Sequence, residues 1–263
     1  MDKKIVEILR GSRPHWVGDG FPVRSVFSYH DRARELSPFL LLDYAAPHEF
    51  TATSRRRGVG AHPHKGFETV TLVYQGELEH RDSSGGGGLI GPGQVQWMTA
   101  GRGIVHEEYH SPAFGEAGGT LEMIQLWVNL RARDKGAEPG YQTLTEIPEV
   151  GPVRVVAGEY QGVRGPAQTF TRINLWELRG PVELRVPEGD TAAVLVLSGE
   201  WQGARAGDLV LLSFSGDELR VDAGPEFRGL FLGGEPIDEP VVGHGPFVMN
   251  TREEIATAFA EMG

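Results

Sequence analysis

Short runs rich in β-branched and aromatic residues, broken by Gly and Pro, recur along the chain and predict strands rather than helices. The run FETVTLVY at 67–74 ends at Gln75-Gly76 and resumes at 77–81. An Asp-Ser-Ser segment followed by the glycines at 85–88 then predicts a hairpin loop. The segment LEMIQLWVNL at 121–130 is a long apolar strand. The pattern therefore indicates an all-β protein.

The second half of the chain repeats the first in a weakened form. VYQGE at 73–77 is echoed by VLSGE at 196–200, and GPGQV at 91–95 is echoed by RAGDL at 205–209. Two tandem β-barrels or sandwiches explain this order of strands and glycine turns. The charged segment at 131–141 is interpreted as a linker, so we expect one domain at residues 1–135 and another at 136–263.

One helix is predicted at the end of the sequence. Thr251 and Glu254 have the spacing of a capping box, in which each side chain accepts the other residue's backbone amide. Ile255, Ala258 and Met262 then fall on one helical face, together with Phe259. We expect a short C-terminal helix that packs on a barrel.

Composition and charge exclude several kinds of function. Lys and Arg number 25 against 36 Asp and Glu, a net charge of −11, which argues against direct binding of nucleic acid or anionic membranes. The absence of Cys excludes disulfides, thiol catalysis and cysteine-based zinc sites. No apolar run approaches the roughly 18 residues of a membrane span, and no signal-peptide core is visible. We therefore expect a cytoplasmic protein, and a monomer, because two fused barrels can cover each other's faces.

Two histidine motifs carry the candidate chemistry. His62 and His64 form an H-x-H pair, and His106 and Glu108 form an H-x-E pair. On a strand, residues i and i+2 point to the same face, so each pair can converge on one ion. Three imidazoles and one carboxylate suit a first-row divalent metal with positions left open for other ligands. Glu68, which lies close after His64, is a competing ligand.

These residues, with several flanking segments, resemble the pirin family of the cupin superfamily. The resemblance implies a bicupin, with two jelly-roll barrels and metal only in the N-terminal one. It places the four metal ligands on His62, His64, His106 and Glu108, which makes Glu68 a structural or supporting residue. The segments are PFLLLDY at 38–44, GAHPHKGFETVTLVYQG at 60–76, LEHRDS at 78–83, MTAGRGIVHEE at 98–108, LWVNL at 126–130 and GHGPFVMNT at 243–251.

The same resemblance implies an iron protein and an activity. Fe(II) is the expected ion, and Mn, Co, Ni, Cu and Zn are the alternatives. The implied activity is that of a quercetin 2,3-dioxygenase, which opens the central ring of a flavonol with O2 and releases carbon monoxide. Glu108 is then the catalytic base for the flavonol 3-hydroxyl. The alternative is a non-catalytic, iron-dependent regulator that binds a transcription factor or a metabolic enzyme.

The remaining candidates are given structural or supporting roles. Four residues are candidates for the apolar wall of the substrate cavity, and most of them are equally consistent with plain core: Phe50, Phe67, Trp97 and Met98. The run Arg55–Arg57 is interpreted as a solvated loop face. Six histidines have no partner at ligand spacing and are treated as structural: His15, His30, His48, His80, His110 and His244.

Overall fold

The computed structural model describes all 263 residues, which fold into two compact units. We call the first the histidine unit, because it contains all the histidines; it comprises Arg13–Asp31, Phe39–Thr145 and Asp238–Gly263. The second, the histidine-free unit, comprises Met1–Ser12, Arg32–Pro38 and Glu146–Ile237. Each unit is assembled from three separate segments of the chain. The domain boundary expected after residue 135 stays a prediction.

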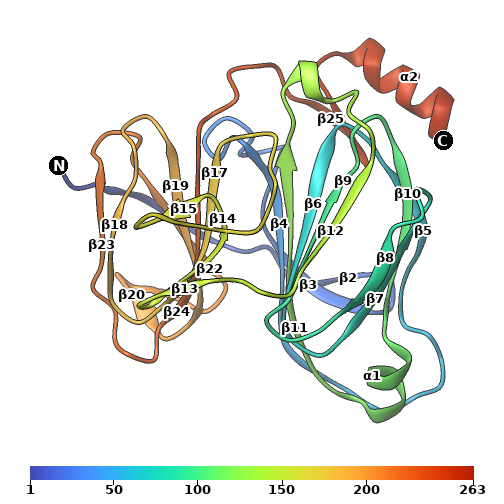
Figure 1. Ribbon diagram of the computed structural model, residues 1–263, viewed down its shortest axis with the longest axis horizontal. Coiled ribbons are helices and arrows are strands. Elements are labelled where there is room, and N and C mark those ends of the chain that lie inside the picture. The colour runs from blue at the N-terminus through green and yellow to red at the C-terminus, as the bar shows by residue number, and fades with distance from the viewer. The chain divides into compact units, whose positions relative to one another are not determined.

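The histidine unit is built on a seven-stranded antiparallel sheet with the order β12-β9-β6-β11-β4-β3-β2 (Figure 1). Its strands are β2 (His15–Val17), β3 (Phe21–Ser28), β4 (Phe39–Phe50), β6 (Phe67–Gln75), β9 (Val95–Thr99), β11 (Gly119–Asn129) and β12 (Gly140–Leu144). The sequence had predicted the strands at 67–74 and 121–130, and both are confirmed.

A four-stranded sheet with the order β5-β10-β7-β8 completes this unit. Its strands are β5 (Gly58–His64), β7 (Leu78–Asp82), β8 (Gly87–Ile90) and β10 (Ile104–His110). Leu78 and Ile90 of this sheet pack with Val23, Val73 and Met123 of the larger sheet in one buried apolar cluster. Burial of apolar surface between the two sheets therefore stabilises the unit. The same packing holds β5, which carries His62 and His64, and β10, which carries His106, against the larger sheet.

The C-terminal segment forms the hairpin β25 (Val242–His244) and β26 (Phe247–Met249) and the helix α2 (Arg252–Met262). The capping box is confirmed: the Glu254 amide donates to Thr251 Oγ1 over 3.2 Å, and the Thr251 amide donates to Glu254 Oε2 over 2.8 Å. Ile255 and Ala258 are buried against β26. Phe259 is partly exposed, although its ring contacts that of Phe247.

Two short helical elements were not predicted. The helix α1 (Pro112–Ala117) begins after Ser111, whose side chain accepts the Phe114 amide. The 3₁₀ helix η1 (Ala132–Asp134) lies within the segment interpreted as a linker. Lys135, which follows it, is buried, and its ammonium donates to the backbone oxygens of Gly66 and Val248. The segment 131–141 is thus part of the histidine unit, and reading it as a linker was wrong.

The histidine-free unit has its own seven-stranded sheet, with the order β1-β22-β19-β24-β17-β14-β13. Its strands are β1 (Ile5–Arg10), β13 (Glu149–Val150), β14 (Val153–Ala157), β17 (Ile173–Arg179), β19 (Thr191–Ser198), β22 (Asp208–Leu212) and β24 (Arg228–Gly234). Three strand pairs complete it: β15 (Glu159–Tyr160) with β16 (Val163–Arg164), β18 (Val182–Arg185) with β23 (Glu218–Val221), and β20 (Glu200–Trp201) with β21 (Ala204–Arg205).

The internal repeat noted in the sequence corresponds to equivalent turns in the two units. Gly76 follows β6 with a φ of 84°, and Gly199 follows β19 with a φ of 72°. Gly93 precedes β9 and Gly207 precedes β22, also with positive φ. A side chain at these positions would strain the backbone, which explains why the glycines recur. The all-β prediction, with two jelly-roll units and a short C-terminal helix, is confirmed.

No helix in the structure has the length and apolar character needed to cross a membrane.

Candidate metal centre

The antiparallel pairing of β5 with β10 brings the two histidine motifs together. His106 lies opposite His62, and Ile104 lies opposite His64. The ring centroid of His106 is 4.2 Å from that of His62 and 4.9 Å from that of His64. One nitrogen from each of the three rings lies within 4.8 Å of the others. Three imidazoles from segments far apart in the sequence therefore converge on one point.

Glu108 lies two residues after His106 on β10, and its side chain reaches the same region. The pairing of β10 with β5 shifts between His106 and Glu108, so that Glu108 lies opposite Val59. Its carboxylate belongs to a second group, in which ligand atoms of His80, His106 and Glu108 lie within 4.8 Å of one another. The hydroxyl of Thr71 on β6 lies 3.4 Å from Glu108 Oε1 and 2.8 Å from Gln125 Oε1, and its single hydrogen is shared between these two acceptors. His106 is thus common to both groups of convergent donors.

The Nδ1 atoms of His62 and His64 each form a hydrogen bond with a backbone carbonyl. His62 Nδ1 lies 2.8 Å from the oxygen of Gly60, and His64 Nδ1 lies 3.4 Å from the oxygen of Pro246. A carbonyl can only accept, so each Nδ1 carries the proton and each Nε2 presents a lone pair. His106 Nε2 is buried and has no hydrogen-bond partner in the protein. A cation bound by these Nε2 atoms would satisfy that orphaned atom, so the residues fit a divalent metal.

Burial sets the charge of the site. It lowers the pKa of His62 and, together with the neighbouring His62 ring, lowers the pKa of His64 to about 3. Burial and then the neighbouring imidazoles also lower the pKa of His106. Burial raises the pKa of Glu108 to about 7, against the opposing hydrogen bond from Thr71. The rings are therefore neutral at physiological pH, as metal ligands must be.

A cavity of about 380 Å³ opens beside these side chains. His62, His64 and Glu108 line it on one side, and most of its other walls are apolar. The polar exceptions are Asp43, which accepts from Ser25 Oγ over 2.6 Å, and Gln125. The other lining residues are Val17, Phe21, Val23, Leu41, Val59, Met123 and Trp127. The volume lies within the range of roughly 300–1,000 Å³ that is usual for small-molecule sites.

The expected wall residues were wrong, because none of Phe50, Phe67, Trp97 and Met98 lines this cavity. Phe67 instead stacks on Trp127, with ring centroids 4.3 Å apart, and so supports the wall from behind.

Glu68 faces away from the convergent histidines. Thr71, three residues further along β6, points toward Glu108, and side chains alternate faces along a strand. The carboxylate of Glu68 instead accepts from Thr99 Oγ1 over 2.7 Å and belongs to neither group of convergent donors. Burial raises its pKa to about 7, against the lowering effect of hydrogen bonds from Thr99 and Trp97.

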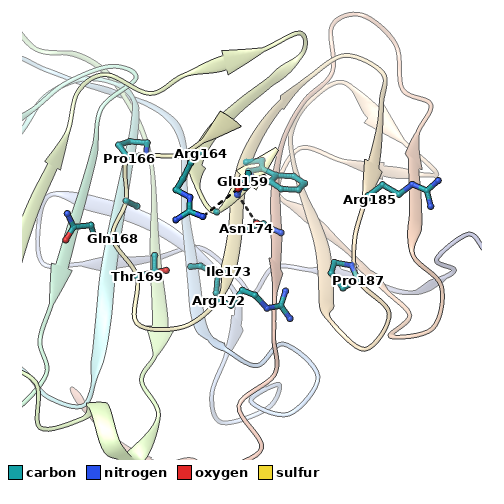
Figure 2. Close-up of a pocket in the computed structure, with 14 residues that line it drawn as sticks. Glu159, Arg164, Pro166, Gln168, Thr169, Arg172, Ile173, Asn174, Arg185 and Pro187 are labelled. Atoms are coloured by element: carbon teal, nitrogen blue, oxygen red, sulfur yellow. Dashed lines mark hydrogen bonds and ion pairs between the residues drawn. The ribbon is translucent and has the colours of Figure 1, made fainter. Parts of the chain in front are cut away.

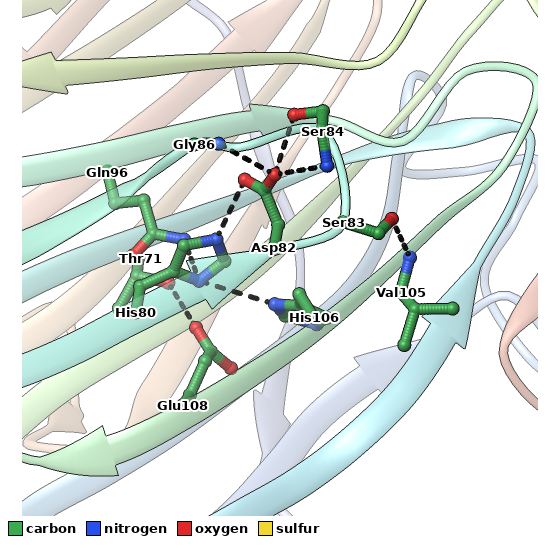
Figure 3. Close-up of polar contacts among 10 residues, drawn as sticks. All are labelled: Thr71, His80, Asp82, Ser83, Ser84, Gly86, Gln96, Val105, His106 and Glu108. Atoms are coloured by element: carbon green, nitrogen blue, oxygen red, sulfur yellow. Dashed lines mark hydrogen bonds and ion pairs between the residues drawn. The ribbon is translucent and has the colours of Figure 1, made fainter.

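His80 is the residue of this region that the sequence interpretation missed. It lies on β7 at the same two-residue spacing from Asp82 that marked the other pairs, and this was the available signal. Its Nε2 lies 3.3 Å from Asp82 Oδ2, and its Nδ1 lies 3.4 Å from His106 Nδ1 (Figure 3). Reading His80 as unconnected to the site was therefore wrong.

The arginines of the basic run at 55–57 form ion pairs at the surface. Arg55 pairs with Asp19 over 2.9 Å, and Arg56 pairs with Glu79 while lying over the ring of Tyr109. This agrees with the interpretation of the run as a loop face.

A larger cavity, of about 730 Å³, lies in the histidine-free unit (Figure 2). Arg164 and Arg172 line it, and each pairs with a carboxylate: Arg164 with Glu159, and Arg172 with Asp190 over 2.7 Å. No histidine lines it, and neither group of convergent metal donors lies in this unit.

Comparison with known proteins gives consistent matches over most of the chain. The family model described as Pirin matches residues 20–128, and that of the Pirin C-terminal cupin domain matches residues 176–262. A Pseudomonas aeruginosa protein named "Putative quercetin 2,3-dioxygenase" is 50% identical over 275 residues, covering 98% of this chain and 96% of its own. A pirin-like protein of Caulobacter vibrioides is 38% identical over 273 residues, covering 98% and 96%.

A solved structure agrees with these matches. The crystal structure of a quercetin 2,3-dioxygenase from Acinetobacter baumannii superposes with a TM-score of 0.95 at 47% identity. The superposition covers 99% of this chain and 96% of the other.

Proposed function

The chain belongs to the pirin family, and from that premise we propose that it is a metal-dependent dioxygenase of the quercetin 2,3-dioxygenase type. The observation that carries the proposal is the cluster of three convergent, neutral imidazoles beside an apolar cavity, with the carboxylate of Glu108 close to one of them, His106. Relatives named for quercetin dioxygenation, one of them as putative, support the substrate class that we propose, a flavonol-like aromatic with O2 as the co-substrate.

His62, His64, His106 and Glu108 would hold the ion. Fe(II) is the ion we propose, with Mn, Co, Ni, Cu and Zn as alternatives that the donor set also accepts. When bound, such an ion supplies Lewis-acid polarisation of the 3-hydroxyl and 4-keto oxygens of the flavonol.

Glu108 is the proposed base. Its carboxylate borders the cavity, and burial raises its pKa to about 7, close to the value that favours proton exchange at neutral pH. It would take the proton of the flavonol 3-hydroxyl, while Thr71 holds one of its oxygens. Ring opening would then consume O2 and release carbon monoxide.

The cavity walls would bind and orient the substrate. Phe21, Leu41 and Trp127 present apolar surface to the aromatic rings and exclude water. Asp43 and Gln125 offer polar atoms for ring hydroxyls on the side of the cavity formed by β4 and β11.

A turnover assay tests the proposal. Metal-loaded protein with quercetin and O2 should remove the flavonol absorbance faster than the same metal without protein. His62→Ala should abolish this activity, whereas His15→Ala, at an exposed histidine of the same unit, should not. Retained metal without turnover of any flavonol would refute the dioxygenase assignment and favour the regulator. Elemental analysis identifies the ion, and we further propose that the protein is a cytoplasmic monomer.

A further inference from the structure

Asp82, His80 and His106 form a buried chain of polar contacts that leads to the metal site (Figure 3). The side chains of His80 and Asp82 are 1% and 0% exposed. Asp82 Oδ1 accepts from the Ser84 amide over 2.8 Å, the Ser84 hydroxyl over 2.6 Å and the Gly86 amide over 3.0 Å. Three donors on one oxygen fix the carboxylate in place, and its other oxygen, Oδ2, faces His80.

The direction of each hydrogen bond follows from these contacts. An ionised carboxylate can only accept, so His80 Nε2 carries the proton toward Asp82. His80 Nδ1 is then an acceptor, and the side-chain amide of Gln96 donates to it over 2.8 Å. His106 Nδ1 lies near the same lone pair, and a proton on His106 Nδ1 makes it a second donor and avoids repulsion between two lone pairs. His106 Nε2, buried and without a protein partner, is left with its lone pair free.

His106 differs in this respect from the other two rings. His62 and His64 are oriented by backbone carbonyls, whereas His106 depends on side chains that a substitution can change. The larger sheet supports the same chain, because Gln96 on β9 lies directly opposite Thr71 on β6, which donates to Glu108. One cross-strand pair thus orients His80 and the carboxylate of Glu108 together.

We propose that Asp82 and His80 are positioning residues that hold His106 in the tautomer with a free Nε2, and thereby set the affinity of the site for a divalent cation. The proposal rests on the metal site of the proposed function but not on flavonol turnover. Outer partners of metal-binding histidines typically change affinity by roughly 10- to 100-fold when removed.

Asp82→Asn is the decisive variant. The asparagine oxygen can keep the contacts to Ser84 and Gly86, while its amide donates to His80 Nε2. The proton of His80 then moves to Nδ1, provided that the Gln96 side-chain amide rotates to present its oxygen instead of its NH2 group. His80 Nδ1 now donates toward His106 Nδ1, and the proton of His106 moves to Nε2. Glu79→Gln, on the same strand, is the matched control, because Glu79 pairs at the surface with Arg56 and Arg81.

Two measurements apply to each protein. Proton–nitrogen correlation spectra of metal-free protein with ¹⁵N-labelled histidines report the tautomer of His106, and titration of Zn²⁺ against a coloured chelator reports affinity. We expect the wild type and Glu79→Gln to carry the proton on Nδ1, and Asp82→Asn to carry it on Nε2 with at least a 10-fold loss of Zn²⁺ affinity.

Several results would overturn the proposal. They are a wild-type His106 protonated on Nε2, an unchanged tautomer in Asp82→Asn, or a switched tautomer without loss of affinity. The wild-type spectrum decides even if the variant does not fold, and neither measurement depends on turnover.

Discussion

Glu68→Gln should remove a fall in the stability of the metal-free protein that occurs as the pH rises through the range of about 4.5 to 7. Glu68 is fully buried, and one of its oxygens accepts from Thr99 over 2.7 Å. Burial raises its pKa from 4.5 to about 7. The folded state therefore keeps a proton that the unfolded state releases, and the free energy of unfolding falls as the pH rises through this interval.

The size of the effect follows from the two pKa values. They differ by about 2.5, and each pKa unit corresponds to about 1.4 kcal/mol, so ionising Glu68 costs the fold about 3 kcal/mol. Glutamine has nearly the same shape, keeps an oxygen for Thr99 and cannot ionise. We therefore expect Glu68→Gln to gain about 3 kcal/mol relative to the wild type between pH 5 and pH 8.

Urea denaturation of metal-free protein at a series of pH values, followed by tryptophan fluorescence, measures this difference. Thr99→Val, which removes the donor, should extend the falling part of the wild-type curve to higher pH. Parallel curves for the wild type and Glu68→Gln would refute the reasoning. The variant should also bind metal with unchanged stoichiometry, and loss of the metal would make Glu68 a ligand after all.

Three further predictions concern the site and the C-terminal helix. His62→Ala and His106→Ala should each lose the bound metal by elemental analysis, while the far-ultraviolet circular dichroism of the β-sheets is unchanged; retained metal would contradict the ligand set. Removing the metal with a chelator should lower the melting temperature, because a cation at 100 times its Kd contributes about 2.7 kcal/mol to the folded state; identical melting with and without metal would contradict this. Thr251→Ala should cost about 1 kcal/mol in urea denaturation through loss of the cap on α2, and a cost near zero would show that the cap contributes nothing to global stability.

Much of the site could be predicted because a strand imposes a simple rule. Side chains two residues apart share a face, so His62 with His64 and His106 with Glu108 were recognisable as pairs. What brings the pairs together is the antiparallel register of β5 with β10, which no local pattern encodes. The family resemblance supplied this long-range information.

Each error has its own physical origin. Apolar character predicts burial but not the face of the strand, so Phe67 and Trp97 were placed in a cavity wall that other residues form. His80 was dismissed because its partner at the right spacing is Asp82, which is an orienting group rather than a ligand. The charged run at 131–141 suggested a linker, yet Lys135 is buried with its donors satisfied by backbone oxygens.

The interleaving of the two units has a consequence for how the protein is made. Leu9 of β1 pairs with Leu209 of β22 in the histidine-free unit, and Lys65 forms a β-bridge with Phe247 of β26 in the histidine unit. The ribosome synthesises the two members of each pair far apart in time, so neither unit can close until its last segment has emerged. The nascent chain must hold unpaired apolar strands in the meantime, which makes it a natural client for chaperones during translation.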